Sequence, residues 1–190
     1  MEELKQRILR DGHVIHKDVL KVDGFLNHQL DIGLLDRIGE QFYARFHSAG
    51  VTKILTIESS GIAVATLTAR HFMVPVVFAR KAPSLTHLDD KFSAEVYSYT
   101  QRKQFTIFVS SEYISHSDKV LVIDDFLANG QALLGLAKIV HQSGAALAGA
   151  GIVIEKAFQD GGDLVRNAGI DVFSLAKVTK MSHGKIYFAD

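Results

Sequence analysis

Runs of aliphatic residues alternate along this chain with segments in which apolar residues recur at every third or fourth position. The aliphatic runs are typical of strands buried on both faces of a parallel sheet. They lie at residues 53–57, 74–79, 120–123, 147–154 and 172–176. The periodic segments predict helices that each turn one apolar face to a core. They lie at residues 2–10, 31–49, 62–72, 133–140 and 161–168.

The order of these elements favours an α/β fold with a doubly wound, mainly parallel sheet flanked by helices. Segments 96–100 and 105–109 alternate apolar and polar residues, which predicts an antiparallel hairpin appended to that sheet. The mixed segment 16–30 predicts a loop-rich lid, and the polar segment 83–95 predicts a long loop.

Composition narrows the class of protein. With 190 residues, of which 47% are hydrophobic, the chain is long enough for one sizeable core, and we expect a single domain over residues 1–190. The formal net charge is zero, so no overall basic field favours nucleic acid. The absence of cysteine excludes disulfides, a thiolate nucleophile and a cysteine zinc site. Residues 1–11 are charged, and no apolar stretch is long enough to span a membrane, so we expect a cytoplasmic protein.

Two acids, Asp124 and Asp125, end the aliphatic run at 120–123, at the edge of the sheet where open α/β folds bind ligands. The loop that opens the next helix consists of Ala128, Asn129, Gly130, Gln131 and Ala132. Backbone N–H groups at such a helix start favour a phosphate, whereas the acids require hydroxyl groups or a cation. A phosphorylated sugar meets both demands. The alternative is an N-cap arrangement that binds no ligand.

A second turn of this kind follows the strand at 53–57 and contains Ser59, Ser60 and Gly61 after Glu58. The glycine permits close approach of the backbone, and successive N–H groups form an anion nest. The alternative is an ordinary strand-to-helix turn with serine as the N-cap. Together, the two turns match a ligand that carries phosphate at one end and pyrophosphate at the other.

Basic and aromatic residues follow two further strands. Lys81 comes just after the strand at 74–79, where its charge can neutralise a pyrophosphate. Lys156 follows the strand at 147–154, where it can donate to the exocyclic oxygen of an oxopurine, and Phe158 can stack on a base. For both lysines the alternative is a solvated position at a strand end.

The segment 120–132 resembles the phosphoribosyl pyrophosphate (PRPP) signature of the type I phosphoribosyltransferases. The resemblance implies that Asp124 and Asp125 hold the ribose hydroxyls, that residues 128–132 wrap the 5′-phosphate, and that the 59–61 turn and Lys81 bind pyrophosphate. The sequence departs from the family pattern at Asn129, where threonine is usual, and at Gln131-Ala132, where small hydroxylated residues are common.

The same resemblance implies further features. A hood is formed by about residues 1–30 and 156–190, and the 83–95 loop with its hairpin forms a flexible loop that closes over the reacting centre. The partners are small-molecule substrates and a second copy of the chain in a homodimer, without nucleic acid or membrane. Mg²⁺ binds through substrate oxygens and water, with no direct protein ligands. A zinc site is not expected, because the nine histidines form no His-Glu-x-x-His motif.

Two segments, 22–31 and 153–161, resemble a subgroup of this family that acts on xanthine in purine salvage. In that subgroup the residues that match Leu20, Asn27 and Lys156 contact the purine. Ala128 stands where relatives that act on hypoxanthine and guanine carry an aspartate, so the phosphate loop contains no general base. A carboxylate on the mobile loop, such as Glu95, is a candidate for that role.

The resemblance therefore implies transfer of the phosphoribosyl group from PRPP to xanthine, giving xanthosine 5′-monophosphate and pyrophosphate. Two alternatives remain open at this point. One is a sibling enzyme that acts on guanine, hypoxanthine or adenine. The other is a non-catalytic regulator that senses PRPP.

Overall fold

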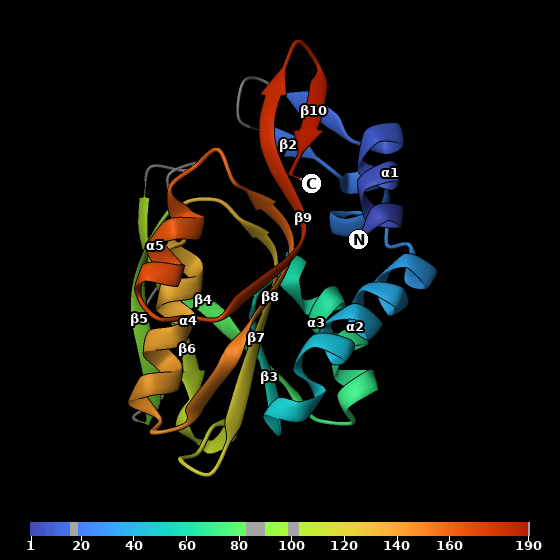
Figure 1. Ribbon diagram of the computed structural model, residues 1–190. Helices are drawn as coiled ribbons and strands as arrows, with labels where there is room; N and C mark the ends of the chain where they lie inside the picture. Colours follow the sequence, from blue (N-terminus) through green and yellow to red (C-terminus); the bar gives the residue numbers. More distant parts are fainter. Residues whose placement is uncertain (16–18, 83–89, 99–102, 190) are drawn as a thin grey trace.

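A computed structural model describes residues 1–15, 19–82, 90–98 and 103–189 of the chain. Within these residues, eight strands form one sheet in the order β10-β9-β8-β7-β3-β4-β6-β5, with helices on both faces (Figure 1). The strands are β3 Lys53–Ile57, β4 Val76–Ala82, β5 Lys91–Ser98, β6 Lys103–Ser110, β7 Lys119–Leu127, β8 Ala146–Lys156, β9 Val172–Ser182 and β10 Lys185–Phe188. The α-helices are α1 Glu2–Asp11, α2 Ile32–Phe46, α3 Ser60–Phe72, α4 Gln131–Gln142 and α5 Gly161–Asn167.

The remaining elements are short. A two-stranded sheet is formed by β1 His13–Ile15 and β2 Val19–Lys21, and a π-helical turn, η1 Asp23–Asn27, follows it. The 3-10 turns are η2 His47–Ala49 and η3 Ser111–Tyr113. The described helices include none that is both long and apolar enough to cross a membrane.

The middle of the sheet is parallel and changes winding direction between β3 and β7. From β3 the chain passes through α3 to β4, whereas from β7 it passes through α4 to β8 and through α5 to β9. Ligands of open α/β sheets bind at the carboxyl ends of the strands beside such a switch point. The two anion-suited turns of the sequence follow β3 and β7, so they flank the switch point of this sheet.

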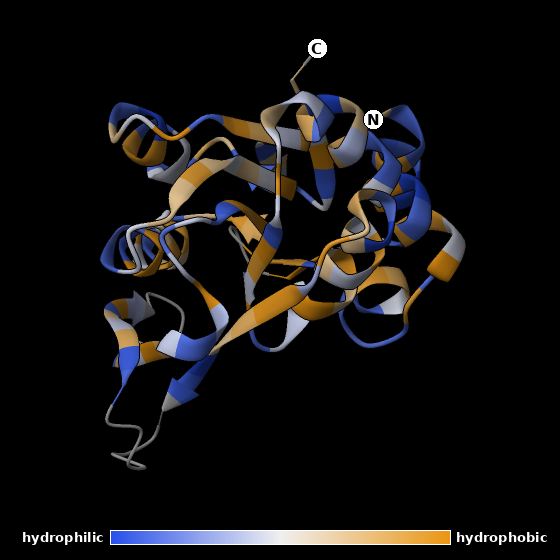
Figure 2. Cartoon of the chain, turned by 90° about the horizontal axis from the view of Figure 1, so that it is seen from below, coloured by the Kyte–Doolittle hydropathy of each residue, from blue (hydrophilic) through white to orange (hydrophobic). Residues whose placement is uncertain are grey.

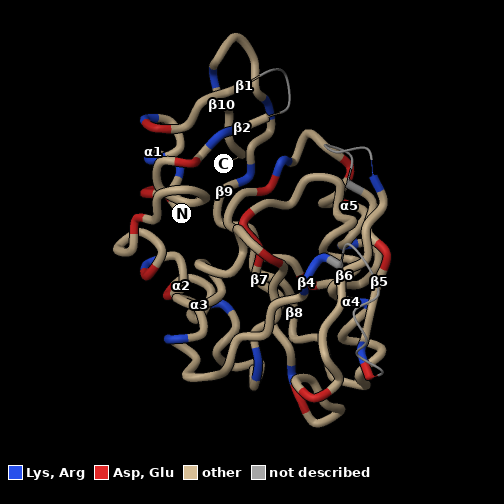
Figure 3. The backbone as a smooth tube through the Cα atoms, turned by 180° about the vertical axis from the view of Figure 1, so that it is seen from behind, with Lys and Arg blue, Asp and Glu red and all other residues tan. Residues whose placement is uncertain are grey.

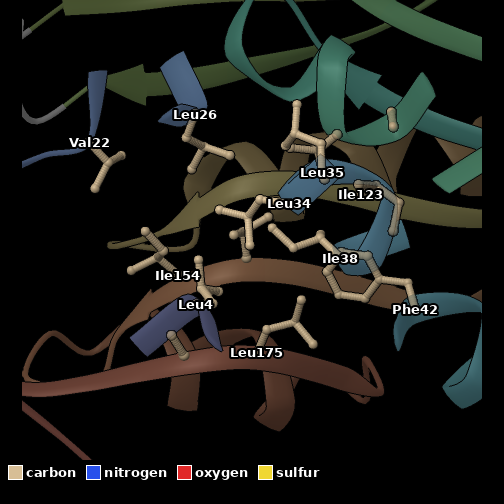
Figure 4. Packing of buried hydrophobic residues seen from close by; sticks show 14 of the residues in the cluster. Leu4, Val22, Leu26, Leu34, Leu35, Ile38, Phe42, Ile123, Ile154 and Leu175 are labelled. Atoms are coloured by element: carbon tan, nitrogen blue, oxygen red, sulfur yellow. The ribbon is translucent and has the colours of Figure 1, made fainter. Parts of the chain in front are cut away.

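Two buried clusters cover the two faces of the sheet. Leu121 and Ile123 of β7 face the cluster under α1, α2 and α3, whereas Val120 and Val122 face the cluster under α4. Figure 2 shows the apolar central strands between helices of mixed hydropathy. Figure 4 shows α2 packed through Leu35 and its neighbours onto the strands that carry Ile123, Ile154 and Leu175. This alternation explains the continuous aliphatic run in the sequence, because both faces of the strand are covered.

The predicted central strands and helices are all present, with ends shifted by a few residues. The β4 strand begins later than predicted and extends to Ala82, and β9 continues to Ser182, where only a strand at 172–176 was predicted. The strands β1, β2 and β10 were not predicted. They are short, and each is exposed on at least one face, which leaves little apolar pattern to find.

The predicted antiparallel hairpin is confirmed, but it is an integral part of the sheet and not an appendage. The strand β6 pairs antiparallel with β4, and β5 continues the same sheet beyond it. Ala94, Val96 and Ile107 are buried against α4, so the hairpin is part of the core. Residues 91–95 are strand, whereas a loop was predicted over 83–95. Residues 83–89 of the predicted flexible loop lie outside the described residues.

Residues 16–18 of the predicted loop-rich lid at 16–30 lie outside the described residues, and for residues 19–30 the prediction is wrong. Val22, Phe25 and Leu26 are completely buried in the cluster with α1 and α2. The segment has no regular period because each of its short elements buries only one or two side chains.

The N-terminal and C-terminal segments lie side by side. The α-amino group of Met1 donates to the Leu175 carbonyl at 2.6 Å, and Lys5 Nζ donates to the Ala189 carbonyl at 2.8 Å. In Figure 1, α1, the β1–β2 hairpin and the β9–β10 hairpin gather at one end of the molecule, beyond the carboxyl ends of β7 and β8.

Candidate functional site

Two buried carboxylates end the strand β7. Asp124 and Asp125 are only 5% and 7% exposed, and the Asp125 amide donates to Asp124 Oδ1 at 3.0 Å. Burial raises the pKa of Asp124 well above its ordinary value, and the neighbouring charge of Asp125 adds to this effect, while the charge of Lys81 opposes it. The protein therefore holds a group here that is costly to ionise in the absence of a ligand.

The alternative that these acids cap the following helix is wrong. Helix α4 begins at Gln131, several residues after the acid pair, and Gly130 is its N-cap. Gly130 has a φ of 79°, a left-handed conformation that favours glycine. Asn129 Oδ1 accepts from the Gln131 amide at 3.2 Å, so Asn129 shapes the loop through its own side chain.

The turn after β3 also leads directly into a helix. Helix α3 begins at Ser60, and the side chain of the N-cap residue, Ser59, makes no capping hydrogen bond in the described structure. Ser59 therefore occupies the N-cap position that the alternative predicts, but its side chain caps no backbone N–H among the described residues. The Glu58–Ser59 peptide bond is cis. Glu58 Oε1 accepts from the Lys81 amide at 2.6 Å, so the turn is tied to the end of β4.

Gly61 brings the two motifs together. A Cβ built on Gly61 would lie 3.0 Å from Asp124 Oδ1 and would overlap the Thr56 hydroxyl. The start of α3 therefore packs directly on the first acid of the pair. The Thr56 hydroxyl is buried and has no hydrogen-bond partner among the described residues, which leaves a polar atom free beside Asp124. Sequence reasoning missed Thr56, because a threonine inside a β-strand carries no signal of its own.

Another glycine, Gly161, packs against the 128–132 loop from outside. A Cβ on Gly161, the first residue of α5, would overlap the Ala128 carbonyl oxygen and would lie 2.5 Å from both Asn129 C and Gly130 N. Only glycine permits this approach, since those atoms are backbone. Gly161 was not predicted as a site residue. It belongs to the 153–161 segment used for the subgroup resemblance, and that was its only signal.

Lys156 lies at the end of β8 with its ammonium group 5.5 Å from the centre of the Phe126 ring. Phe126 directly follows Asp125, so a basic group and an aromatic face stand beside the acid pair. Phe126 was missed in the sequence, because it continues an apolar strand. Phe158 is 37% exposed on the turn that follows β8, which leaves part of its ring accessible.

The other predicted base-binding residues come from the N-terminal segment. Leu20, on β2, is buried in the cluster against which Phe126 also packs. Asn27 ends the π-helical turn and is exposed. Their contact with a purine stays a prediction.

Glu95 is not on a loop in the described structure. It lies on β5, and Glu95 Oε2 accepts from Gln104 Nε2 on β6 at 2.7 Å. Its suggested role as a loop base therefore loses the location on which it rested. Among the described residues, no three His, Cys, Asp or Glu side chains gather into a metal site. Binding of Mg²⁺ through substrate oxygens stays a prediction. Figure 3 shows acidic and basic positions interspersed along the chain.

Comparisons with known proteins agree with this geometry. The family model described as phosphoribosyl transferase domain matches residues 27–167. The chain is 53% identical over 190 residues to a xanthine phosphoribosyltransferase of Ruminiclostridium cellulolyticum, covering 100% of both chains. It is 54% identical over 190 residues to that of Oceanobacillus iheyensis, covering 100% of this chain and 98% of the other. The adenine phosphoribosyltransferase structure from Rhodothermus marinus has a TM-score of 0.76 at 22% identity, over 93% of this chain and 97% of that chain, which shows the same fold.

Proposed function

Because this chain belongs to the phosphoribosyl transferase family, we propose that it is a purine salvage enzyme that uses xanthine. It transfers the 5-phosphoribosyl group from PRPP to xanthine and forms xanthosine 5′-monophosphate and pyrophosphate. The relatives named xanthine phosphoribosyltransferase match essentially the whole chain at 51–54% identity. The matched length includes the loops of the site as well as the framework.

The observation that carries the proposal is the placement of two anion-suited turns on either side of a buried acid pair. The 58–61 turn and the 128–132 loop follow β3 and β7, which are neighbours in the sheet. Asp124 and Asp125 lie between them. A sugar with a pyrophosphate on one carbon and a phosphate on another fits this spacing of charges and hydroxyl acceptors.

In this reaction the side chains mainly position the substrates and stabilise developing charge. Pyrophosphate leaves from the ribose as a purine nitrogen attacks, so positive charge develops on the sugar and negative charge on the leaving group. Backbone N–H groups of the 59–61 turn and the Lys81 ammonium stabilise the leaving group, and the acid pair orients the ribose and favours its cationic character. Binding of the hydroxyls and of the positively charged sugar offsets the cost of ionising Asp124 that burial imposes.

Mg²⁺ is the metal that this substrate requires, since it neutralises charge on the pyrophosphate. Within the part of the chain that the structure describes, the acid pair is not joined by a third His, Asp or Glu side chain, which fits an ion held mostly by substrate oxygens and water. Asp124 and Asp125 are the residues that would face it, through the ribose hydroxyls or through water.

Selection of the base rests on the ends of β8 and of the N-terminal segment. Lys156 donates to an oxygen of the oxopurine, Phe158 stacks on the ring, and Leu20 and Asn27 complete the contact. The aromatic face of Phe126 beneath the Lys156 ammonium supports this placement. We place residues 1–30 and 156–190 in a hood over the base, within a single domain. This rests on α1, the β1–β2 hairpin and the β9–β10 hairpin, which gather beyond the carboxyl ends of the central strands (Figure 1).

The experiment is to incubate the protein with PRPP and Mg²⁺ and with xanthine, guanine, hypoxanthine or adenine separately. Xanthosine 5′-monophosphate as the main product supports the proposal. If the main product comes from guanine, hypoxanthine or adenine, that base is the substrate instead of xanthine. If no base gives a nucleotide, the enzyme hypothesis is wrong and the hypothesis of a PRPP-sensing regulator remains. Binding of PRPP in the absence of a purine then tests that hypothesis.

We further propose a cytoplasmic homodimer. Salvage draws on the cytoplasmic pools of PRPP and purines. An open groove of about 760 Å³ on β4 and β6 exposes Phe78 and Tyr113 on a face that a second copy can cover. Sedimentation of the protein checks this, since Phe78→Asp should shift a dimer to monomer.

A further inference from the structure

A half-buried ion pair, Glu155 and Arg166, lies outside the proposed substrate contacts and behind the 128–132 loop. Glu155 is 3% exposed at the end of β8, and both of its oxygens accept from Arg166 of α5, at 2.7 Å each. Ser174 Oγ of β9 donates to Glu155 Oε2 at 2.5 Å. Burial opposes ionisation of Glu155, but the bonds from Arg166 and Ser174 outweigh it and leave its pKa below the ordinary value. The pair is therefore charged at neutral pH.

We propose that Glu155 and Arg166 are positioning residues, which hold the first turn of α5 against the 128–130 loop and so preform the 5′-phosphate site. This inference rests on the proposed function, in which that loop binds the 5′-phosphate of PRPP. Removing the Glu155 carboxylate from water is costly, and the Arg166 side chain keeps partial contact with solvent, so the ion pair by itself gives little net stability compared with apolar side chains. Its geometry, a two-point bond between a strand end and a short helix, is suited to fixing orientation.

Two adjacent glycines carry the effect of the pair to the loop. A Cβ on Gly162 would overlap Glu155 Oε1 and would lie 2.7 Å from Arg166 Nη1, so the first turn of α5 sits directly on the ion pair. On its other side, Gly161 packs against the backbone of Ala128, Asn129 and Gly130. The turn is thus held between the ion pair and the loop. A shift of α5 toward or away from Glu155 changes the position of the loop.

The same pair also borders the base side of the site. Glu155 pairs with Leu127 in the β7–β8 register, directly before the loop begins, and it precedes Lys156. The Gln159 amide donates to the Lys156 carbonyl at 2.9 Å, which closes the turn between β8 and α5. The Glu155–Arg166 ion pair therefore fixes the backbone that carries both Lys156 and the 128–132 loop. The direct backbone contact is to the loop, so the larger effect is expected on PRPP.

The test compares Arg166→Met with a matched ion pair at the opposite edge of the sheet. Lys53 Nζ and Asp118 Oδ2 are 3.0 Å apart, partly buried, at the amino ends of β3 and β7. With Arg166→Met we expect KM for PRPP to rise about tenfold, a larger rise than for xanthine, whereas Asp118→Asn leaves both values unchanged. Arg166→Lys, which keeps the charge and one donor, should recover part of the loss. Equal KM values for PRPP in Arg166→Met and wild type overturn the proposal.

A double variant separates positioning from stability. Glu155→Leu with Arg166→Met removes both charges, so the free energy of unfolding is expected to stay close to wild type. KM for PRPP should still rise, because the two-point bond is gone. If the double variant instead restores wild-type KM, the pair acts only through stability and the inference is wrong.

Hydrogen exchange of the 128–132 amides, measured without substrates, distinguishes failure of this inference from failure of the proposed function. If the wild-type protein makes no xanthosine 5′-monophosphate, the proposed function is wrong, but this result does not contradict the positioning role. In that case hydrogen exchange still tests the positioning role of Glu155 and Arg166. Faster exchange of these amides in Arg166→Met than in Asp118→Asn supports that role. Equal exchange in the two variants overturns it.

Discussion

Asp124 Oδ1 lies 3.0 Å from the point where Gly61 would carry a Cβ, so the acid pair at the end of β7 and the turn after β3 are packed as one unit. The contact joins the proposed ribose and pyrophosphate sites across the switch point of the sheet. It explains why only glycine fits at the start of α3, although the backbone there is helical.

Gly61→Ala should disturb both motifs together. The added methyl group overlaps the Thr56 hydroxyl and crowds Asp124, and overpacking of this kind costs about 1–3 kcal/mol. We expect a lower free energy of unfolding in urea and a raised KM for PRPP. Gly24→Ala is the matched control, because its Cβ meets no atom within 4 Å. Wild-type behaviour of Gly61→Ala would contradict the close contact.

Asp125→Asn should lower turnover roughly 100-fold, in the range seen when one electrostatic group is removed from a reacting centre. The side chain keeps its size, so the melting temperature should stay near that of wild type. Steady-state rates with xanthine and PRPP measure the effect, with Asp118→Asn as the control acid at the other edge of the sheet. Unchanged turnover would contradict the proposed ribose role.

Asp124→Asn should stabilise the ligand-free protein at neutral pH. The pKa of Asp124 is raised in the fold above its ordinary 3.8, so its contribution to stability is complete below that value and is lost as pH rises through the folded pKa. The amide avoids this loss, and each kcal/mol gained raises the melting temperature by about 2–4 °C. Melting curves from acid to neutral pH should show a gain over wild type that grows with pH.

Asp118→Asn should change the melting temperature at neutral pH in the opposite direction. Burial opposes the ionisation of Asp118, but the Ser115 amide, Lys53 and Thr52 outweigh it and lower its pKa. Its contribution is present above the unfolded pKa and is lost as pH falls through the folded pKa. The variant should therefore melt below wild type at neutral pH. If both variants shift in the same direction, the explanation for Asp124 is wrong.

Lys156→Ala should impair the use of xanthine far more than the binding of PRPP. The ammonium group over Phe126 is the donor proposed for the oxopurine, and a lost charge-assisted bond typically costs about 1.5–3 kcal/mol, or roughly 10- to 100-fold in kcat/KM for xanthine. Lys180→Ala is a suitable control, because Lys180 on β9 also holds its ammonium group over an aromatic ring. Its Nζ lies 5.9 Å from the ring centre of Tyr187 on β10. Equal losses for both substrates would count against a base-contacting lysine.

The sequence alone was sufficient for features whose information lies within one short segment. The aliphatic run at 120–123, the acid pair and the loop with Gly130 are consecutive, so the strand, the proposed site and the start of the helix follow from local pattern. The same holds for the strand at 53–57, whose bounds the structure reproduces. These patterns also placed both turns at the carboxyl edge of the sheet, because parallel strands share that edge.

Contacts between distant segments could only come from the tertiary structure. The pairing of β6 with β4, the burial of Phe25, the seat of Gly161 on the phosphate loop and the bond between Glu155 and Arg166 each join residues that no local period relates. Backbone approach and side-chain pairing depend on where whole elements pack, and packing is set by the shape of both buried clusters together. The residues of the proposed site were therefore readable from the sequence, while the contacts that support them were decided by the fold.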